Sequence, residues 1–71
     1  MHILIFKTNI RFSKEIKRVE EVFKYIPNVL SWHVDREDVD KVLRIESVTN
    51  NKEEIINLIK QEGYVCEELM N

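Results

Sequence analysis

The chain has 71 residues, which is enough for one small domain over residues 1–71 with a single core of modest stability. Its 44% hydrophobic and 34% charged residues are typical of a globular protein, and a net charge of −2 gives no general attraction to nucleic acid or to an anionic membrane. The sequence shows no secretory signal and no apolar run long enough to cross a bilayer, and its single cysteine, Cys66, favours the reducing cytoplasm.

The hydrophobic pattern alternates between the period of a strand and that of a helix, in the order strand, helix, strand, and then the same again. It predicts strands at residues 3–6, 30–34, 42–45 and 64–69, and helices at residues 13–26 and 52–62. Each strand–helix–strand unit should cross over in the right-handed sense, because this is how its helix is buried on the sheet.

In the first half, residues 1–7 are apolar in both alternating sets, as in a central strand. Ser13 is expected to cap the following helix, and Pro27 ends it because the residue before a proline is pushed out of the helical region. In the next strand, alternation predicts that Trp32 and His33 point to opposite faces of the sheet.

In the second half, the charged residues 36–40 are expected to form a hairpin connection. The returning strand should turn two apolar residues to one face, Leu43 and Ile45, and three others to the opposite face, Val42, Arg44 and Glu46. The second helix is expected to begin with a capping box between Asn51 and Glu54, and Gly63 lies just past its end, where a left-handed residue is favoured.

Two passages resemble the heavy-metal-associated domain, the fold of small copper chaperones and of the metal-binding repeats of heavy-metal pumps. Residues 25–35 (YIPNVLSWHVD) are similar to the family's L-P-G-V-x-S-V-x-V-D passage, and residues 53–64 (EEIINLIKQEGY) are similar to its E-E-I-I-x-A-I-x-x-A-G-Y passage. The resemblance covers almost the whole chain. It implies an α+β, ferredoxin-like β-α-β-β-α-β sandwich, in which a four-stranded antiparallel sheet carries both helices on one face.

The chain departs from this family at the metal motif, M-x-C-x-x-C, between the first strand and the first helix. Counting back from Pro27 places Ile10 at the methionine of the motif, Phe12 at its first cysteine and Glu15 at its second. Thiolate is the ligand that selects Cu(I) and holds zinc, whereas a phenyl ring has no donor atom and a single carboxylate is a hard ligand. We therefore expect the scaffold without its metal site, and no cofactor.

The other ligand-type residues have ordinary interpretations. Cys66 is expected to be a packed core thiol, and a relocated metal or redox thiol is the alternative. His2 and His33 are expected to be surface residues on the solvent side of the sheet, and the family fold places His33 and Cys66 at opposite edges. No nucleophile–base set and no phosphate-binding glycine loop is visible, so we predict that the chain is not an enzyme.

A possible interaction surface surrounds the start of the first helix. Its basic residues form either a solvated face or a docking patch for an acidic partner, and they are Arg11, Lys14, Lys17 and Arg18. Phe12 either packs over the first helical turn or points outward with Ile10 as a contact anchor.

The open face of the sheet is a second possible surface. If Ile3 and Ile5 face the helices, then Leu4 and Phe6 face outward beside Val42, and the reverse register leaves the other apolar pair outside. Apolar residues on two central strands would form a patch that favours self-association or partner binding.

The sequence therefore predicts a small, cytoplasmic, non-catalytic binding module that acts through a protein partner or through self-association. One alternative is a metal-ion binding protein or chaperone that uses non-standard ligands such as Cys66 or a second subunit. The other is a single-stranded RNA binder, because RNA recognition modules share this fold, although the third strand, residues 42–46, lacks stacking aromatics.

Overall fold

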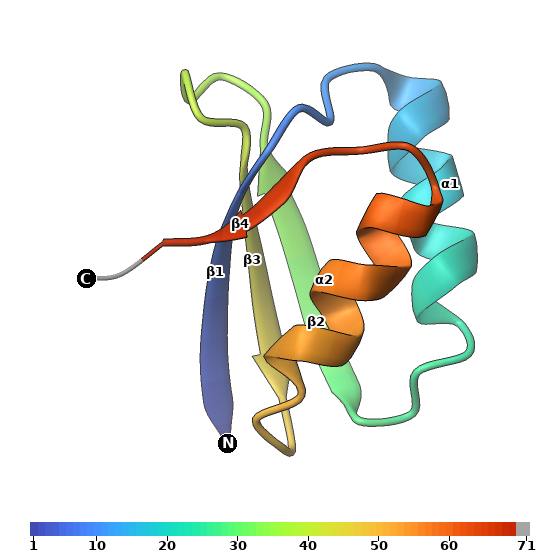
Figure 1. The fold of residues 1–71 in the computed structure, drawn as a ribbon, viewed down its shortest axis with the longest axis vertical. Helices are drawn as coiled ribbons and strands as arrows, with labels where there is room; N and C mark the ends of the chain where they lie inside the picture. The colour runs from blue at the N-terminus through green and yellow to red at the C-terminus, as the bar shows by residue number, and fades with distance from the viewer. Residues whose placement is uncertain (70–71) are drawn as a thin grey trace.

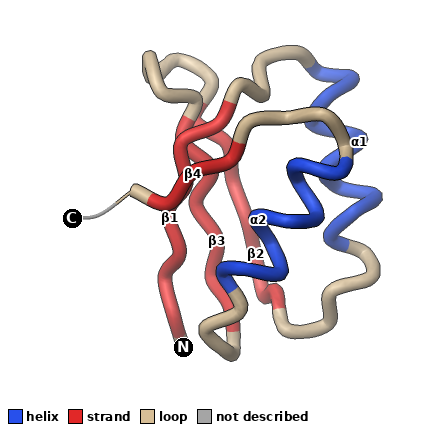
Figure 2. Tube along the Cα trace, in the orientation of Figure 1, coloured by secondary structure: helices blue, strands red, loops and turns tan. Residues whose placement is uncertain are grey.

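The computed structural model describes residues 1–69 and contains four strands and two helices. In chain order these are β1 (His2–Thr8), α1 (Ser13–Phe23), β2 (Val29–Asp35), β3 (Val42–Ser47), α2 (Lys52–Gln61) and β4 (Cys66–Glu68). The strands form one antiparallel sheet in the order β2-β3-β1-β4. Both helices cover the same face of this sheet, and its other face is open (Figures 1 and 2). This is the ferredoxin-like β-α-β-β-α-β sandwich that the family resemblance implied.

The strand directions bring two distant loops to one end of the molecule. β1 and β2 both run antiparallel to β3, so they are parallel to each other and their last residues lie at the same end of the sheet. Residues 9–12, which lead into α1, therefore lie near the hairpin of residues 36–41, at the top of Figure 1. The backbone N–H of Thr8 donates to the carbonyl of Asp40 (3.0 Å), and the Thr8 hydroxyl donates to the carbonyl of Lys41.

β1 buries Leu4 and Phe6 against the helices and turns its other apolar set outward. Leu4 is paired with Ile45, and Phe6 is paired with Leu43, and both β3 residues are completely buried. The prediction that Leu4 and Phe6 face outward is therefore wrong, and the reverse register holds. Because β1 is apolar in both alternating sets, its own pattern could not decide which set is buried.

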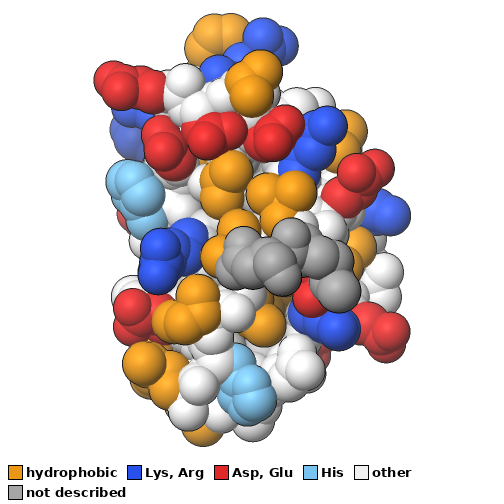
Figure 3. Space-filling model, turned by 90° about the vertical axis from the view of Figure 1, so that its left-hand side faces the viewer, with side chains coloured by type: hydrophobic (Ala, Val, Ile, Leu, Met, Phe, Trp, Pro, Cys, Tyr) orange, Lys and Arg blue, Asp and Glu red, His pale blue; other side chains and the backbone are white. Residues whose placement is uncertain are grey.

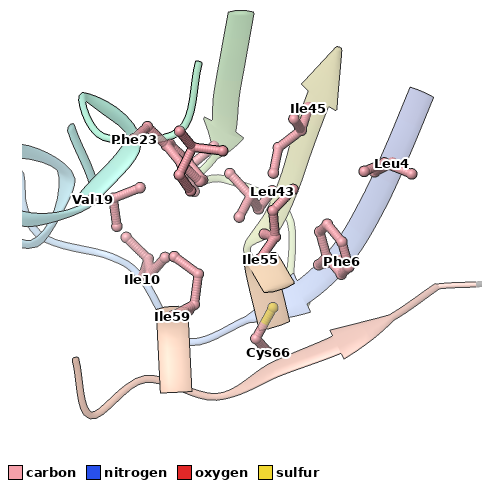
Figure 4. Close-up of a cluster of buried hydrophobic side chains, with 12 residues drawn as sticks. Leu4, Phe6, Ile10, Val19, Phe23, Leu43, Ile45, Ile55, Ile59 and Cys66 are labelled. Carbon is pink, nitrogen blue, oxygen red and sulfur yellow. The ribbon is translucent and has the colours of Figure 1, made fainter. Parts of the chain in front are cut away.

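The core lies between the sheet and the two helices, and Figure 4 shows its side chains converging from both layers. The ring of Phe23 packs against that of Trp32, with 5.3 Å between the ring centroids. Within residues 1–69 the buried hydrophobic side chains are Leu4, Phe6, Ile10, Val19, Phe23, Ile26, Val34, Leu43, Ile45, Ile55, Ile59 and Cys66.

The bounds of all six elements differ from the predicted ranges, by one to three residues at one end or both. α1 ends at Phe23, and residues 24–25 form a turn, while β4 spans only residues 66–68. Asn51 stands at the N-cap of α2, but its side chain makes no capping hydrogen bond, and its oxygen accepts one from the hydroxyl of Ser47 (2.8 Å). Gly63 has a φ of +93°, as expected for the residue after a helix. Within residues 1–69, neither helix has the length and hydrophobicity that a membrane span needs.

Candidate functional site

The connection between β1 and α1, residues 9–12, contributes one side chain to the core, that of Ile10. This side chain is completely buried, and Figure 4 places it beside Val19 and Ile59. Its backbone N–H donates to the hydroxyl of Thr8 (3.2 Å), which is itself buried. The prediction that Ile10 serves as an outward contact anchor is therefore wrong. An aliphatic side chain with room beneath it gains more by burial than by exposure at a loop.

The side chain that caps the start of α1 belongs to the first turn of the helix and not to the residue before it. Phe12 is the N-cap residue, with an extended backbone (φ −98°, ψ 154°), and Ser13 is already the first residue of the helix. The carboxylate of Glu15 turns back and accepts hydrogen bonds from the backbone N–H groups of Phe12 and Arg11, each at 2.9 Å. These two bonds, Phe12 first, lower the pKa of Glu15. Ser13 is thus not the cap that the sequence predicted, and Glu15 forms its half of a capping box without a Ser or Thr partner.

The ring of Phe12 is 57% exposed at this end of the molecule. The guanidinium carbon of Arg11 lies 5.6 Å from the centroid of the ring, within the range of a cation–π contact. Of the two interpretations of Phe12, the outward one therefore matches the structure. An exposed aromatic ring beside an arginine is a pair that binding surfaces favour.

The three exposed basic residues of α1 have different surroundings. The Nε of Arg18 donates to the carboxylate of Glu62 at 2.7 Å, which raises the pKa of the guanidinium and ties Arg18 to the end of α2. Lys14 and Lys17 have no carboxylate within 4 Å in the described part of the chain, and the same is true of Arg11. Arg18 is therefore not a free member of the predicted basic surface, whereas the other three are.

Arg36, the residue after β2, lies beside this surface, although the sequence analysis did not include it. Its guanidinium lies 3.4 Å from both the carbonyl oxygen of Arg11 and the hydroxyl of Ser13. Beside it, a groove of about 410 Å³ runs between α1 and β2, and its lining includes Lys17 and Trp32. The position of Arg36 could have been inferred from the predicted topology. A right-handed crossover between two parallel strands places the final residues of both strands at one end of the sheet.

Cys66 is a packed core thiol, as predicted. Its side chain is 1% exposed on β4, and burial raises the pKa of the thiol to about 11. His33 lies exposed on β2 at the opposite edge of the sheet, and His2 is exposed at the start of β1. Among residues 1–69, no group of three or more His, Cys, Asp or Glu side chains converges in a way that could hold a metal ion.

The open face of the sheet mixes apolar and charged side chains (Figure 3). Ile3 is 42% exposed there and is paired with Glu46, while the half-buried Ile5 is paired with Arg44. On the other side of Arg44 lies His33 of β2. Single apolar side chains among charged ones are normal for a solvated face, so this face is a weaker candidate than the end that carries Phe12.

Comparison with known proteins identifies the fold. No family model and no curated protein matches the sequence. The solved structure of the N-terminal domain of PacS from Synechocystis PCC6803 superposes with a TM-score of 0.80 and 14% identity, covering 99% of this chain and 100% of that one. The N-terminal domain of ZntA, solved in its Zn(II) form, superposes with a TM-score of 0.78 and 12% identity, covering 93% of this chain and 89% of that one. The chain therefore has the fold of these two N-terminal domains, the heavy-metal-associated fold that its sequence resembles.

Proposed function

We propose that this domain is a non-catalytic binding module that keeps the heavy-metal-associated fold without its cysteine ligands and acts through contacts with a protein partner. The observation that carries the proposal is the conformation of the β1–α1 connection, in which each residue that aligns with the family's metal motif has another role. Ile10 is packed in the core, Phe12 presents an exposed ring, and the Glu15 carboxylate caps α1.

These residues do not fit a soft metal ion. Cu(I) selects soft sulfur ligands, and zinc takes three or four converging thiolate, imidazole or carboxylate ligands, whereas residues 9–15 contain no Cys or His and a single carboxylate, Glu15. One oxygen of Glu15 already accepts two backbone hydrogen bonds, so binding a cation through it would compete with the cap. The thiol of Cys66, with a pKa of about 11, is protonated at neutral pH and closed off from solvent.

The same end of the molecule has the features of a protein-binding surface. Phe12 is a large exposed hydrophobic residue, and Arg11 lies against its ring. Aromatic and arginine residues supply most of the strongest contacts at interfaces. Lys14, Lys17 and Arg36 gather positive charge on the α1 side of this end, while the adjoining hairpin carries Glu37, Asp38 and Asp40. Such a surface favours a partner with an acidic face, because opposite charges speed the encounter and select against partners of the wrong sign.

The structure offers little to an RNA ligand on the open face. Recognition of single-stranded RNA by this type of fold depends on aromatic rings that stack on bases from the two central strands. Phe6 is the aromatic residue of β1, and it is completely buried against the helices. β3 has none.

Site-specific photocrosslinking tests the protein-contact proposal. Phe12 is replaced by the photoreactive p-benzoylphenylalanine in the full chain, and the control carries the same group at Tyr25, which is 82% exposed after the far end of α1. On irradiation in the source cells, we expect a discrete protein adduct from position 12 that position 25 does not give. No adduct from position 12, or the same adducts from both positions, would contradict the proposal.

A further inference from the structure

The two edges of the sheet differ in how they are protected. β4 is an edge strand of three residues, two of which are glutamates. β2, the other edge, has seven residues, contains no lysine or proline, and is in regular register with β3 from Ser31 to Asp35 after an irregularity at its start. Short length, charge and proline are the usual devices that prevent another chain from pairing with an edge. The outer side of β2 therefore presents backbone donors and acceptors at strand spacing with little to block them.

The groove between α1 and β2 lies beside this edge. Ile16, Trp32 and Val34 supply its apolar lining, and Lys17 and Arg36 supply its positive charge. Trp32 is held in place by its contact with Phe23, so this part of the lining is fixed before any ligand arrives. Within residues 1–69 neither Lys17 nor Arg36 has a carboxylate within 4 Å.

We propose that the edge of β2 and this groove together receive an extended acidic segment of the partner protein, which adds to the sheet as a fifth strand. The inference rests on the proposed function and specifies the kind of partner. Side chains alternate between the two faces of a strand, so every second residue of the segment faces the groove. An apolar side chain then lies on Trp32 and Ile16, and acidic side chains on either side of it approach Lys17 and Arg36. Backbone hydrogen bonds supply affinity in this mode, and the groove supplies specificity.

The charges disfavour the other occupants. If two copies paired through β2, they would bring Lys17 and Arg36 of both chains into one interface, and neither residue has an ion-pair partner among residues 1–69. A nucleic acid would satisfy the positive charge but not the row of backbone donors and acceptors along the strand. An acidic polypeptide satisfies both.

Two designed peptides test the proposal with the full chain. One has the sequence Thr-Glu-Thr-Val-Thr-Glu-Thr, which places Glu, Val and Glu on one face in either strand direction, and the matched peptide has Lys in place of both Glu. Trp32 is the single tryptophan of the chain, so its fluorescence reports directly on the groove. We expect the glutamate peptide to change the Trp32 emission in a saturable and salt-sensitive way and to protect β2 amides from hydrogen exchange. The lysine peptide should bind at least roughly tenfold more weakly.

Charge reversal gives the sharpest test. The variant Lys17→Glu/Arg36→Glu should reverse the preference, so that it binds the lysine peptide better. The control Lys24→Glu/Lys60→Glu changes the net charge equally at positions that do not line the groove and should keep the original preference. Thermal unfolding of both variants establishes that each is folded before its peptide preference is measured.

Four results would overturn the inference. The first is no change in Trp32 emission with the glutamate peptide at millimolar concentration, and the second is an unchanged peptide preference in the Lys17→Glu/Arg36→Glu variant. The third is protection of the β2 amides from exchange that rises with protein concentration in the absence of peptide. The fourth is a change in Trp32 emission with a uridine oligonucleotide that equals the change with the glutamate peptide. The crosslinking test at Phe12 is independent of all four. Crosslinked adducts at Phe12 without peptide binding would support the protein-binding function and contradict only the proposal that the partner adds to the sheet as a fifth strand.

Discussion

Replacing Glu15 by alanine tests whether this position serves the helix rather than a metal. The substitution removes the acceptor for two backbone N–H groups, those of Arg11 and Phe12, each bonded at 2.9 Å. Both hydrogen bonds are exposed to solvent, so water can bond to the two N–H groups in the variant and offset part of the lost stability. Loss of an N-terminal cap costs about 0.5–2 kcal/mol, and we expect about 1 kcal/mol here. For a domain of this size that corresponds to a fall in melting temperature of roughly 4–8 °C.

The pH dependence of Glu15→Gln separates the contribution of the charge from that of the hydrogen bonds. The pKa of Glu15 lies below its ordinary value of 4.5 in the folded protein, so the unfolded state takes up the proton first as the pH falls. The stabilisation by the carboxylate is therefore complete above the ordinary pKa and is lost as the pH drops through the lowered one. Glutamine keeps one acceptor oxygen, and we expect the variant to lose less stability than alanine does at neutral pH and to approach wild type in acid.

Urea unfolding followed by circular dichroism measures both effects, with Glu20→Ala as the control. Glu20 is an exposed residue of the same helix, and its side chain makes no hydrogen bond among residues 1–69. The capping role would be refuted if Glu15→Ala and Glu20→Ala differed by less than about 0.3 kcal/mol in the free energy of unfolding. It would also be refuted if the deficit of Glu15→Gln stayed constant down to about pH 3.

Three further predictions concern the fold and the thiol. Gly63 has a φ of +93° with no atom within 4 Å of an added Cβ, so Gly63→Ala should lower the free energy of unfolding by about 1–2 kcal/mol through backbone strain alone, as urea titration would measure. Phe6→Ala should lower the free energy of unfolding by about 3–5 kcal/mol, and Ile3→Ala by less than about 1 kcal/mol, because Phe6 is buried and Ile3 is exposed. Equal losses in the two variants, measured by the same urea titration, would contradict the β1 register. Cys66, with its pKa of about 11 and 1% exposure, should resist a thiol-specific maleimide at about pH 8 until the protein is unfolded, and rapid labelling of the native protein would show an accessible thiol.

The order and type of the elements could be predicted because local signals agree with the fold. Gly63 and the alternation of Leu43, Arg44 and Ile45 each predicted a feature that the structure confirms. The direction in which β1 faces could not be predicted from β1 itself, since both of its alternating sets are apolar. It follows from the pairing with β3, where the charged Arg44 leaves only one face for the core.

Helix caps were harder to predict because each polar side chain has more than one hydrogen-bonding partner available in the folded chain. Asn51 has the right side chain for a cap, but in the folded chain its oxygen accepts a hydrogen bond from the hydroxyl of Ser47 and not from the helix. Ser13 lies one residue inside the helix, because the carboxylate of Glu15 reaches the two backbone N–H groups ahead of it. These outcomes depend on side chains that only the folded chain brings together.

The residues of the proposed interaction surface could be predicted where they are neighbours in sequence, and Arg36, which is not, was missed. Arg11, Phe12 and the two lysines that follow lie within seven residues of one another. Arg36 comes from the end of another strand, and only the crossover places it against the β1–α1 connection. The ion pair that occupies Arg18 could not be predicted either, because its partner Glu62 is 44 residues away along the chain.

Metal binding by the unmodified chain, compared with a variant that restores the two thiols, tests the central claim most directly. Protein purified without chelator is analysed for copper and zinc and then titrated with Cu(I) and Zn(II) against competing chelators. We predict that wild type carries no stoichiometric metal, while Phe12→Cys/Glu15→Cys, which places two thiols at the positions that the sequence comparison assigned to the family's cysteines, binds about one equivalent. Wild-type protein that holds a full equivalent of either metal against the chelators would contradict the claim that this loop is now used for helix capping and protein contacts.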